Sequence, residues 1–192
     1  MNNQSNDIED KFKIIISVGD ESGIGPEIIL KALFSKEIPQ NLDFIIVGSK
    51  NNLENTYKNL KSLGVKNIVD PNNYKICDIK IPFEINKPKK SNGNASFFYL
   101  KKAIEIVQKY TNAALVTGPI CKKSWSLAGH NYSGQTELLA ETCHVKDVGM
   151  LFTAKSPITG WRFNTLLATT HIPLSEVPVS YTHLTLPTNR EV

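Results

Sequence analysis

Three short aliphatic runs, each followed by a glycine-containing turn, constrain the fold of this chain more than any other feature. Residues 13–18 read KIIISV, residues 43–47 read DFIIV and residues 113–117 read AALVT. Runs of this length and β-branched content are typical of strands that are buried on both faces. The sequence therefore predicts three such strands, each followed by a loop at its carboxyl end.

Helical patterns separate these strands. Pro26 suits the first turn of a helix that extends to about Phe34, because the missing N–H of proline would be unpaired there. Residues 52–63 form a second predicted helix, closed by Gly64, which suits a left-handed cap. Residues 94–110 carry apolar side chains at spacings of three and four, on one helical face. The alternation predicts an α/β fold with a largely parallel sheet flanked by helices.

Other segments give weaker patterns. Prolines interrupt residues 66–74 and 76–85 and limit them to short or edge strands. The lysine-rich run at residues 87–90 is interpreted as a solvated loop. Further elements are predicted near the end of the chain: a helix at 135–143 and strands at 148–153 and 166–169.

The composition excludes several classes of protein. With 41% hydrophobic and 8% aromatic residues, the 192-residue chain can close a core, so neither wholesale disorder nor a low-complexity fibre is expected. No apolar stretch approaches the roughly 20 residues that a membrane span requires. Residues 1–11 are polar and acidic, unlike a signal peptide. We expect a cytoplasmic protein without a membrane partner.

The cysteine content and the charge argue against further classes of protein. The three cysteines form no C-x-x-C motif, which argues against a disulfide framework and against a cysteine zinc site. The net charge is +4, from 22 Lys and Arg against 18 Asp and Glu, but nearly all of the cations are scattered lysines. Nucleic-acid recognition favours clustered arginine with interleaved aromatic residues. A nucleic-acid partner is therefore only a weak alternative.

The first loop after a predicted strand is a candidate binding site, because ligands of open α/β sheets bind beyond the carboxyl ends of the strands. Residues 19–27 contain Asp20 and Gly25. The motif G-x-G-x-x-G is not completed, since Ile28 stands where the third glycine would be. The backbone amides and the following helix N-terminus could bind an anion or a polar substrate. A turn that serves only packing is the alternative.

Two later loops supply reactive side chains. Lys122 and Lys123 closely follow Thr117, and two ammonium groups with a hydroxyl suit a phosphate or carboxylate; a lysine there could also move a proton. A solvated lysine pair is the alternative. His171 follows the predicted strand at 166–169, and a neutral imidazole is a common ligand of divalent metals. A structural histidine is the alternative.

Four motifs together resemble one family. They are SVGDESGIGPE at residues 17–27, LVTGPICK at 115–122, GQTE at 134–137 and ATTHIPL at 168–174. In this order and at these separations, they resemble the 4-hydroxythreonine-4-phosphate dehydrogenase family of pyridoxal phosphate biosynthesis.

The resemblance implies an isocitrate/isopropylmalate-dehydrogenase-like α/β fold and a homodimer whose active site is completed by the partner subunit. It implies NAD-dependent oxidation of the C3 hydroxyl of 4-phosphooxy-L-threonine and loss of its carboxylate as CO2. The implied product is 3-amino-2-oxopropyl phosphate. A divalent metal, Zn, Mg or Co, would polarise the hydroxyl oxygen.

The resemblance also implies roles for single residues. His171 matches a metal-binding histidine of the family. Gln135 and Thr136 match a substrate-contacting pair, in which many family members have His at the position of Gln135. Lys122 matches the lysine of the Thr-Gly-Pro motif and is expected to act at the catalytic centre by compensating substrate charge. Asp20 and Gly25 of the first loop are expected to bind substrate as well.

The match does not reach the end of the family's proteins. Their other two metal-binding histidines and later substrate-binding Lys, Asn and Arg lie beyond the point where this chain ends. We expect a first α/β domain at residues 12–130 and the truncated start of a second domain at 131–178. Residues 179–192, which are rich in Thr and Leu, are interpreted as a foreign or artefactual tail. The 192-residue chain alone is expected to be poorly soluble and inactive.

Two other functions stay open. Gln135 is compatible with a sister dehydrogenase that acts on another phosphorylated four-carbon acid, such as a threonate phosphate. A phosphate-binding acyltransferase or a non-catalytic phosphate-binding module would also use glycine-rich loops.

Overall fold

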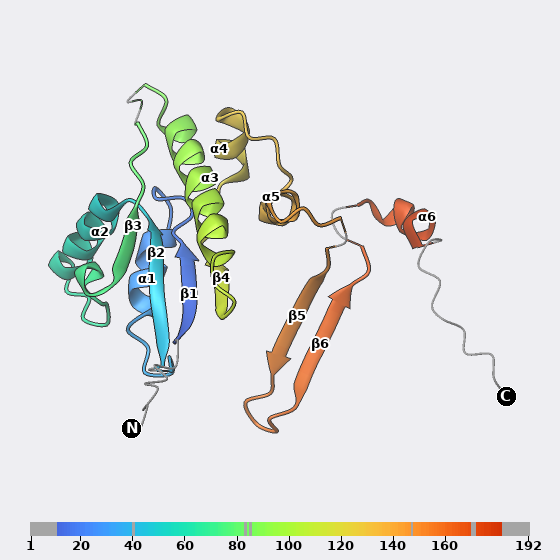
Figure 1. The fold of residues 1–192 in the computed structure, drawn as a ribbon, viewed down its shortest axis with the longest axis horizontal. Coiled ribbons are helices and arrows are strands. Elements are labelled where there is room, and N and C mark those ends of the chain that lie inside the picture. Colours follow the sequence, from blue (N-terminus) through green and yellow to red (C-terminus); the bar gives the residue numbers. More distant parts are fainter. Residues whose placement is uncertain are drawn as a thin grey trace, which may run out of the picture. The chain divides into compact units, whose positions relative to one another are not determined.

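A computed structural model describes residues 11–39, 41–82, 84, 86–146, 148–169 and 172–181. The chain divides into two compact units, Met1–Cys143 and His144–Val192. The first unit is an α/β layer structure, and the second contains an antiparallel hairpin followed by short helices (Figure 1).

Four parallel strands form the sheet of the first unit, in the order β3-β2-β1-β4 (Figure 1). The strands are β1 (Phe12–Ser17), β2 (Leu42–Gly48), β3 (Lys75–Asp78) and β4 (Ala113–Thr117). The register pairs Ser17 with both Val47 and Thr117. The carboxyl ends of the three strands β2, β1 and β4, with the loops that follow them, therefore lie at one edge of the sheet.

Helices cover both faces of this sheet (Figure 1). The long helices are α1 (Gly25–Ala32), α2 (Lys50–Ser62) and α3 (Pro88–Val107). Side chains of α1 and α2 pack with Ile16 and Ile46 in one apolar cluster. Ala103 of α3 packs with Ile15 and Val47 in another. Since neighbouring residues of a strand point to opposite faces, α3 lies across the sheet from α1.

The predicted α/β class, with a parallel sheet flanked by helices, is confirmed in the first unit. The three aliphatic runs form β1, β2 and β4 within a residue or two of their predicted bounds. Gly64 has a φ of 79°, which is the left-handed conformation expected after the end of α2.

The interpretation of residues 87–90 as a loop is wrong, because α3 begins at Pro88. Proline fits this position since the first N–H groups of a helix have no intrahelical acceptor. Residues 66–74 contain only the short 3-10 helix η1 (Pro71–Asn73) and no strand. The short edge strand that was predicted nearby is β3, at one end of the sheet.

Two further helices pack on α3. They are α4 (Lys122–Leu127), which the sequence pattern did not reveal, and α5 (Gln135–Thr142), which it did. Trp125 is fully buried in the cluster that joins α3, α4 and α5, and its indole N–H donates to Oγ of Ser96 at 2.8 Å. A Cβ on Gly93 of α3 would overlap the backbone carbonyl of Ser124, so this glycine allows the two helices to approach closely.

The second unit contains the antiparallel strands β5 (Met150–Lys155) and β6 (Arg162–Leu167). The predicted strand at 166–169 has the wrong bounds. Pairing with β5 extends the strand back to Arg162, and it ends at Leu167. The segment η2 (Leu174–Glu176) and helix α6 (Val177–Tyr181) follow. Apolar side chains of the hairpin are largely exposed, and Ile158, Trp161 and Phe152 are 92%, 64% and 54% exposed.

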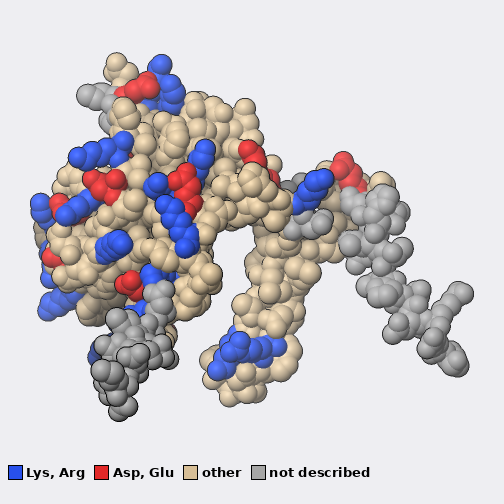
Figure 2. All heavy atoms as spheres, viewed as in Figure 1, with Lys and Arg blue, Asp and Glu red and all other residues tan. Residues whose placement is uncertain are grey.

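Figure 2 shows one face of the molecule, on which Lys and Arg side chains are interspersed with Asp and Glu over the first unit. All three cysteines are free thiols. Across the part of the chain that the structure describes, no helix combines the length and the hydropathy that a membrane crossing requires.

Candidate functional site

The loops after β1 and β4 meet at the carboxyl edge of the sheet. The backbone N–H of Asp20 donates to the carbonyl of Pro119 at 2.8 Å, and the N–H of Gly118 donates to the carbonyl of Ser17 at 2.7 Å. These two bonds continue the β1–β4 pairing beyond the last residues of the strands. The first two loops that the sequence singled out therefore lie side by side.

Glycine is required where these loops meet. Gly19 has a φ of 77°, and a Cβ there would overlap the carbonyl oxygen of Pro119. A Cβ on Gly118 would overlap the carbonyl of Val18 and lie 2.8 Å from that of Ser17. Backbone packs directly on backbone here, which fixes the two loops relative to each other.

The two predicted substrate residues of the first loop have different environments. Oδ1 of Asp20 accepts hydrogen bonds from the N–H and the hydroxyl of Ser22, at 3.0 and 2.7 Å. This carboxylate is therefore oriented by its own turn. Gly25 is buried at the first position of α1, where a Cβ would overlap the carbonyl of Val18. Gly25 therefore brings the N-terminus of α1 against the end of β1.

Gln135 connects the second loop with α5. Its side-chain Nε2 donates to the carbonyl of Gly118 at 3.0 Å. Thr136, the next residue of α5, is half-buried. Lys122, the first residue of α4, is exposed, and its Nζ lies 3.8 Å from the point where a Cβ on Gly134 would stand. The structure thus brings together the predicted residues Lys122, Gln135 and Thr136 beside the loop that contacts Asp20.

A carboxylate that the sequence did not single out anchors the first loop. Oε2 of Glu21 accepts a hydrogen bond of 2.8 Å from the hydroxyl of Tyr99, which is 1% exposed on α3. The backbone carbonyl of Glu21 accepts a bond of 3.1 Å from Nδ2 of Asn52 on α2. Helices from both faces of the sheet therefore hold the loop.

Burial changes the ionisation of this pair. Desolvation raises the pKa of Glu21 above its usual range, against the opposing effect of the Tyr99 hydrogen bond, and the charge of Asp20 raises it further. Desolvation and the charge of Glu21 raise the pKa of Tyr99, so its hydroxyl stays protonated and donates at neutral pH. The loop is thus held by a neutral donor and a carboxylate that is costly to charge.

A signal for Tyr99 was present in the sequence. Ala95, Tyr99 and Ala103 are buried at a constant spacing of four on α3. This spacing marks a second buried stripe beside the one that predicted the helix. Nothing in the sequence indicated that Glu21 would be the partner, because the two residues are 78 positions apart.

The predicted metal ligand His171 lies outside the described residues. Within the described ranges, no group of three or more His, Cys, Asp or Glu side chains could hold a metal ion. The described side chains therefore do not form a metal site by themselves, and the metal stays a prediction.

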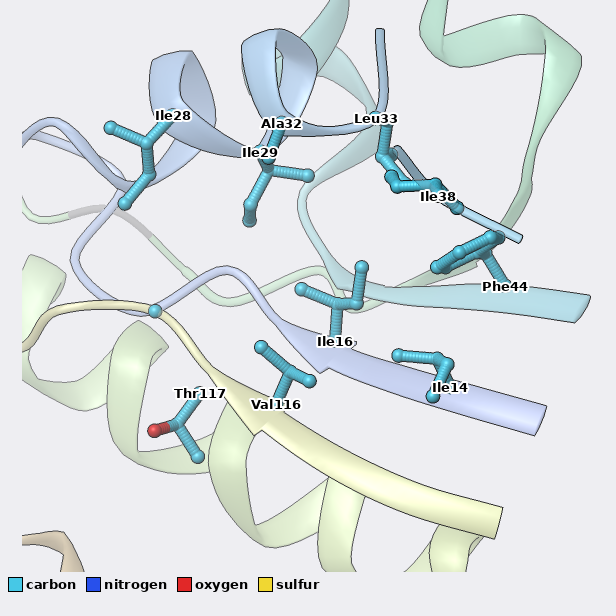
Figure 3. A pocket seen from close by; sticks show the side chains of 11 residues that line it. Ile14, Ile16, Ile28, Ile29, Ala32, Leu33, Ile38, Phe44, Val116 and Thr117 are labelled. Carbon is cyan, nitrogen blue, oxygen red and sulfur yellow. The ribbon is translucent and has the colours of Figure 1, made fainter. Parts of the chain in front are cut away.

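An apolar groove lies next to the β4 loop (Figure 3). Ile14 and Ile16 of β1, Ile28 of α1 and Val116 of β4 line it, with Thr117 at its end, and its volume is about 270 Å³. Its lining contains no charged side chain. It does not suit a phosphorylated substrate, so the candidate site is the loop cluster around Gly118.

Comparison with known proteins identifies the family to which this chain belongs. Residues 40–188 match the family model described as pyridoxal phosphate biosynthetic protein PdxA. A 4-hydroxythreonine-4-phosphate dehydrogenase of Nostoc sp. is 44% identical over 184 residues, which cover 91% of this chain and 51% of the relative. The chain spans about half the length of the curated relatives it matches.

Two other similar proteins are informative: one has a solved structure, and the other is named for a different substrate. A solved structure of a Salmonella typhimurium protein, described as a 4-hydroxythreonine-4-phosphate dehydrogenase, aligns with a TM-score of 0.64 and 26% identity, over 85% of this chain and 53% of that chain. A Fusobacterium nucleatum protein named as a D-threonate 4-phosphate dehydrogenase is 32% identical over 158 residues, which cover 74% of this chain and 46% of the relative.

Proposed function

Because the chain belongs to the family of pyridoxal phosphate biosynthetic protein PdxA, we propose that it is part of a dehydrogenase that acts on 4-phosphooxy-L-threonine. Hydride passes from C3 to NAD+, and the proton of the C3 hydroxyl is released. The β-keto acid then loses its carboxylate as CO2 and takes up a proton at C2. The product is 3-amino-2-oxopropyl phosphate.

One observation carries this proposal: the hydrogen bond between Nε2 of Gln135 and the carbonyl of Gly118. It joins the two motifs GQTE and TGP, which are separate in the sequence, into one cluster at the carboxyl edge of the sheet. Ligands of open α/β sheets bind at this edge.

The residues of this cluster have distinct roles in the proposed reaction. Lys122 is exposed and unrestrained by a described ion pair, so its ammonium can turn toward the anionic groups of the substrate. Thr136 offers a hydroxyl that can both donate and accept. Asp20 and Gly25 belong to the neighbouring first loop, whose backbone is fixed by the bond from the N–H of Asp20 to the carbonyl of Pro119 and by the close approach of Gly25 to Val18.

NAD and a divalent metal are proposed on the family resemblance alone. A divalent ion would favour loss of the hydroxyl proton when bound. Since the described side chains do not form a metal site, His171 would need ligands from other parts of the full-length polypeptide or from a partner subunit. We also propose that the active form is a cytoplasmic homodimer with an isocitrate/isopropylmalate-dehydrogenase-like fold, and that the 192-residue chain alone is inactive.

The test begins with the source DNA, resequenced across codon 178, and the uninterrupted reading frame is then expressed. We expect the purified full-length protein to form NADH with 4-phosphooxy-L-threonine and a divalent metal, and to release CO2. The 192-residue chain is the matched control and should form none. A full-length protein that forms no NADH with this substrate would contradict the proposal, and NADH formation by the short chain would contradict its inactivity.

A second candidate function is oxidation of a threonate 4-phosphate. The observation that favours it is the 32% identity to the Fusobacterium protein of that name. The same NADH assay separates the two candidates when both compounds are supplied at equal concentration, because the substrate with the larger kcat/KM identifies the activity.

A further inference from the structure

Two buried acceptor atoms on the first turn of α5 lack donors. Oε1 of Gln135 and Oε2 of Glu137 are both inaccessible to solvent and accept no hydrogen bond in the described structure. A buried acceptor without a partner is unfavourable in the free protein. A ligand that donates to these oxygens removes that penalty on binding.

The free atom of Gln135 is identified by its neighbour. The carbonyl of Gly118 can only accept, so the side-chain atom 3.0 Å from it must be the amide nitrogen. Oε1 is therefore the atom left without a partner. Gln135 offers a ligand an acceptor, which suits N–H or O–H groups rather than a phosphate or carboxylate.

Glu137 is held close to Lys122 without pairing with it. Its Oε2 lies 3.4 Å, and Nζ of Lys122 lies 3.8 Å, from the point where a Cβ on Gly134 would stand. No hydrogen bond or ion pair joins these two described side chains. The carboxylate thus keeps its capacity to accept, while the exposed lysine is free to contact an anionic group.

We propose that Glu137, together with Oε1 of Gln135, binds the amino group of the substrate and selects a phosphorylated hydroxy amino acid over the corresponding hydroxy acid. This inference rests on the proposed function. An ammonium group supplies three N–H donors and a positive charge, which match one carboxylate and one amide oxygen. A hydroxyl in the same position supplies one donor and no charge. Glu137 is therefore a specificity-determining residue.

A structural role for Glu137 predicts a different outcome. An acidic residue in the first turn stabilises a helix through its dipole. Loss of that effect would lower the thermal stability of a variant but would weaken binding of both compounds equally. Selectivity between the two compounds is therefore the readout that separates the roles.

The experiment measures binding rather than turnover. Binding to the full-length protein without NAD is measured by isothermal titration calorimetry with 4-phosphooxy-L-threonine and, separately, with threonate 4-phosphate. We expect the amino compound to bind at least tenfold more tightly. Glu137→Gln should reduce this ratio to below threefold with less than a twofold change for threonate 4-phosphate, and Glu137→Asp should restore part of it. Glu141→Gln is the matched control on the same helix, where the exposed carboxylate accepts from Tyr132, and should leave the ratio unchanged.

Equal affinities of the unsubstituted full-length protein for the two compounds, a ratio retained in Glu137→Gln, or binding of neither compound would each overturn the inference. Its failure is distinguishable from failure of the proposed function. NADH formation by the full-length protein with a ratio that Glu137→Gln does not change would overturn the inference alone. A ratio that depends on Glu137 in a protein whose full-length form produces no NADH would overturn the proposed activity alone.

Discussion

The hydroxyl of Tyr99 on α3 donates a hydrogen bond of 2.8 Å to the carboxylate of Glu21, 78 positions earlier in the chain. Tyr99 is buried in the apolar cluster that also contains Ile16 and side chains of α1 and α2, and Glu21 belongs to the loop that carries Asp20. Through this bond, the packing of a helix determines the position of a loop at the candidate site.

Removal of the Tyr99 hydroxyl should destabilise the protein. Tyr99→Phe leaves the half-buried Glu21 carboxylate without its donor, and we expect a loss of about 1–3 kcal/mol in the free energy of unfolding, measured by urea denaturation. Tyr132→Phe is the matched control, because Tyr132 donates to the exposed Glu141. Its effect should stay within about 0.5 kcal/mol. Equal losses in both variants would show that the Tyr99–Glu21 bond has no special contribution.

Glu21 should make stability depend on pH in a defined direction. Since its pKa is raised in the folded state, the folded protein binds more protons than the unfolded chain from about the ordinary value of 4.5 upward to the raised pKa. Stability from this group is therefore lost as pH rises through that window. Glu21→Gln still accepts from Tyr99 but does not titrate, so its free energy of unfolding relative to the original chain should increase between pH 4 and pH 7.

Urea titrations at several pH values test this expectation. A difference between the two proteins that stays constant with pH, or that decreases as pH rises, would contradict the raised pKa of Glu21.

The contact between the two loops should not tolerate a side chain at Gly118. Gly118→Ala places a methyl group against the carbonyls of Val18 and Ser17, so the backbone must shift, at a cost of about 1–3 kcal/mol or more. Gly23→Ala is the matched control in the first loop, where a Cβ meets its nearest atom at an ordinary 3.4 Å. Thermal denaturation should show a large decrease in Tm for the first variant and little change for the second. Similar values of Tm would contradict the close packing of these loops.

The hairpin of the second unit should bind apolar dyes. Phe152 and Phe163 are 54% and 48% exposed on β5 and β6, and patches of this kind promote association. Replacing both with Thr, which keeps the β propensity, should reduce ANS fluorescence at least twofold and reduce light scattering. Leu63→Thr is the control, since Leu63 is 78% exposed at the end of α2, outside the hairpin. An equal reduction in the control would contradict a specific role of the hairpin.

The elements that were predicted from the sequence are those whose pattern is local. Strands β1 and β2 are aliphatic runs whose C-terminal halves are buried, and such runs are visible without knowledge of their neighbours. The expectation that β4 is buried on both faces is wrong, because β4 is an edge strand in which Val116 is 48% exposed. The end of α2 was visible because only glycine adopts a φ of 79° without cost. The order of the strands was not predicted, since pairing depends on contacts between distant segments.

The elements that were missed depend on tertiary contacts. The start of α3 carries lysines and Pro88, which resemble a loop, but Gly93 lets this helix pack closely on α4. Helix α4 has six residues and is stabilised mainly by burial of Trp125, which no periodic pattern of that length could reveal. Of the candidate site, the loop residues were predicted, whereas the anchoring role of Glu21 was not.

The pairing of β1 with β4 also has a consequence for synthesis on the ribosome. Ser17 and Thr117, which are paired, stand 100 positions apart in the sequence. At about 5–20 residues per second, β1 emerges several seconds before its partner exists, and its edge stays open during that time. The loops at Gly19 and Gly118 come into contact only after this delay. A nascent chain therefore acquires its candidate binding site in one late step, after most of the first unit has already been translated.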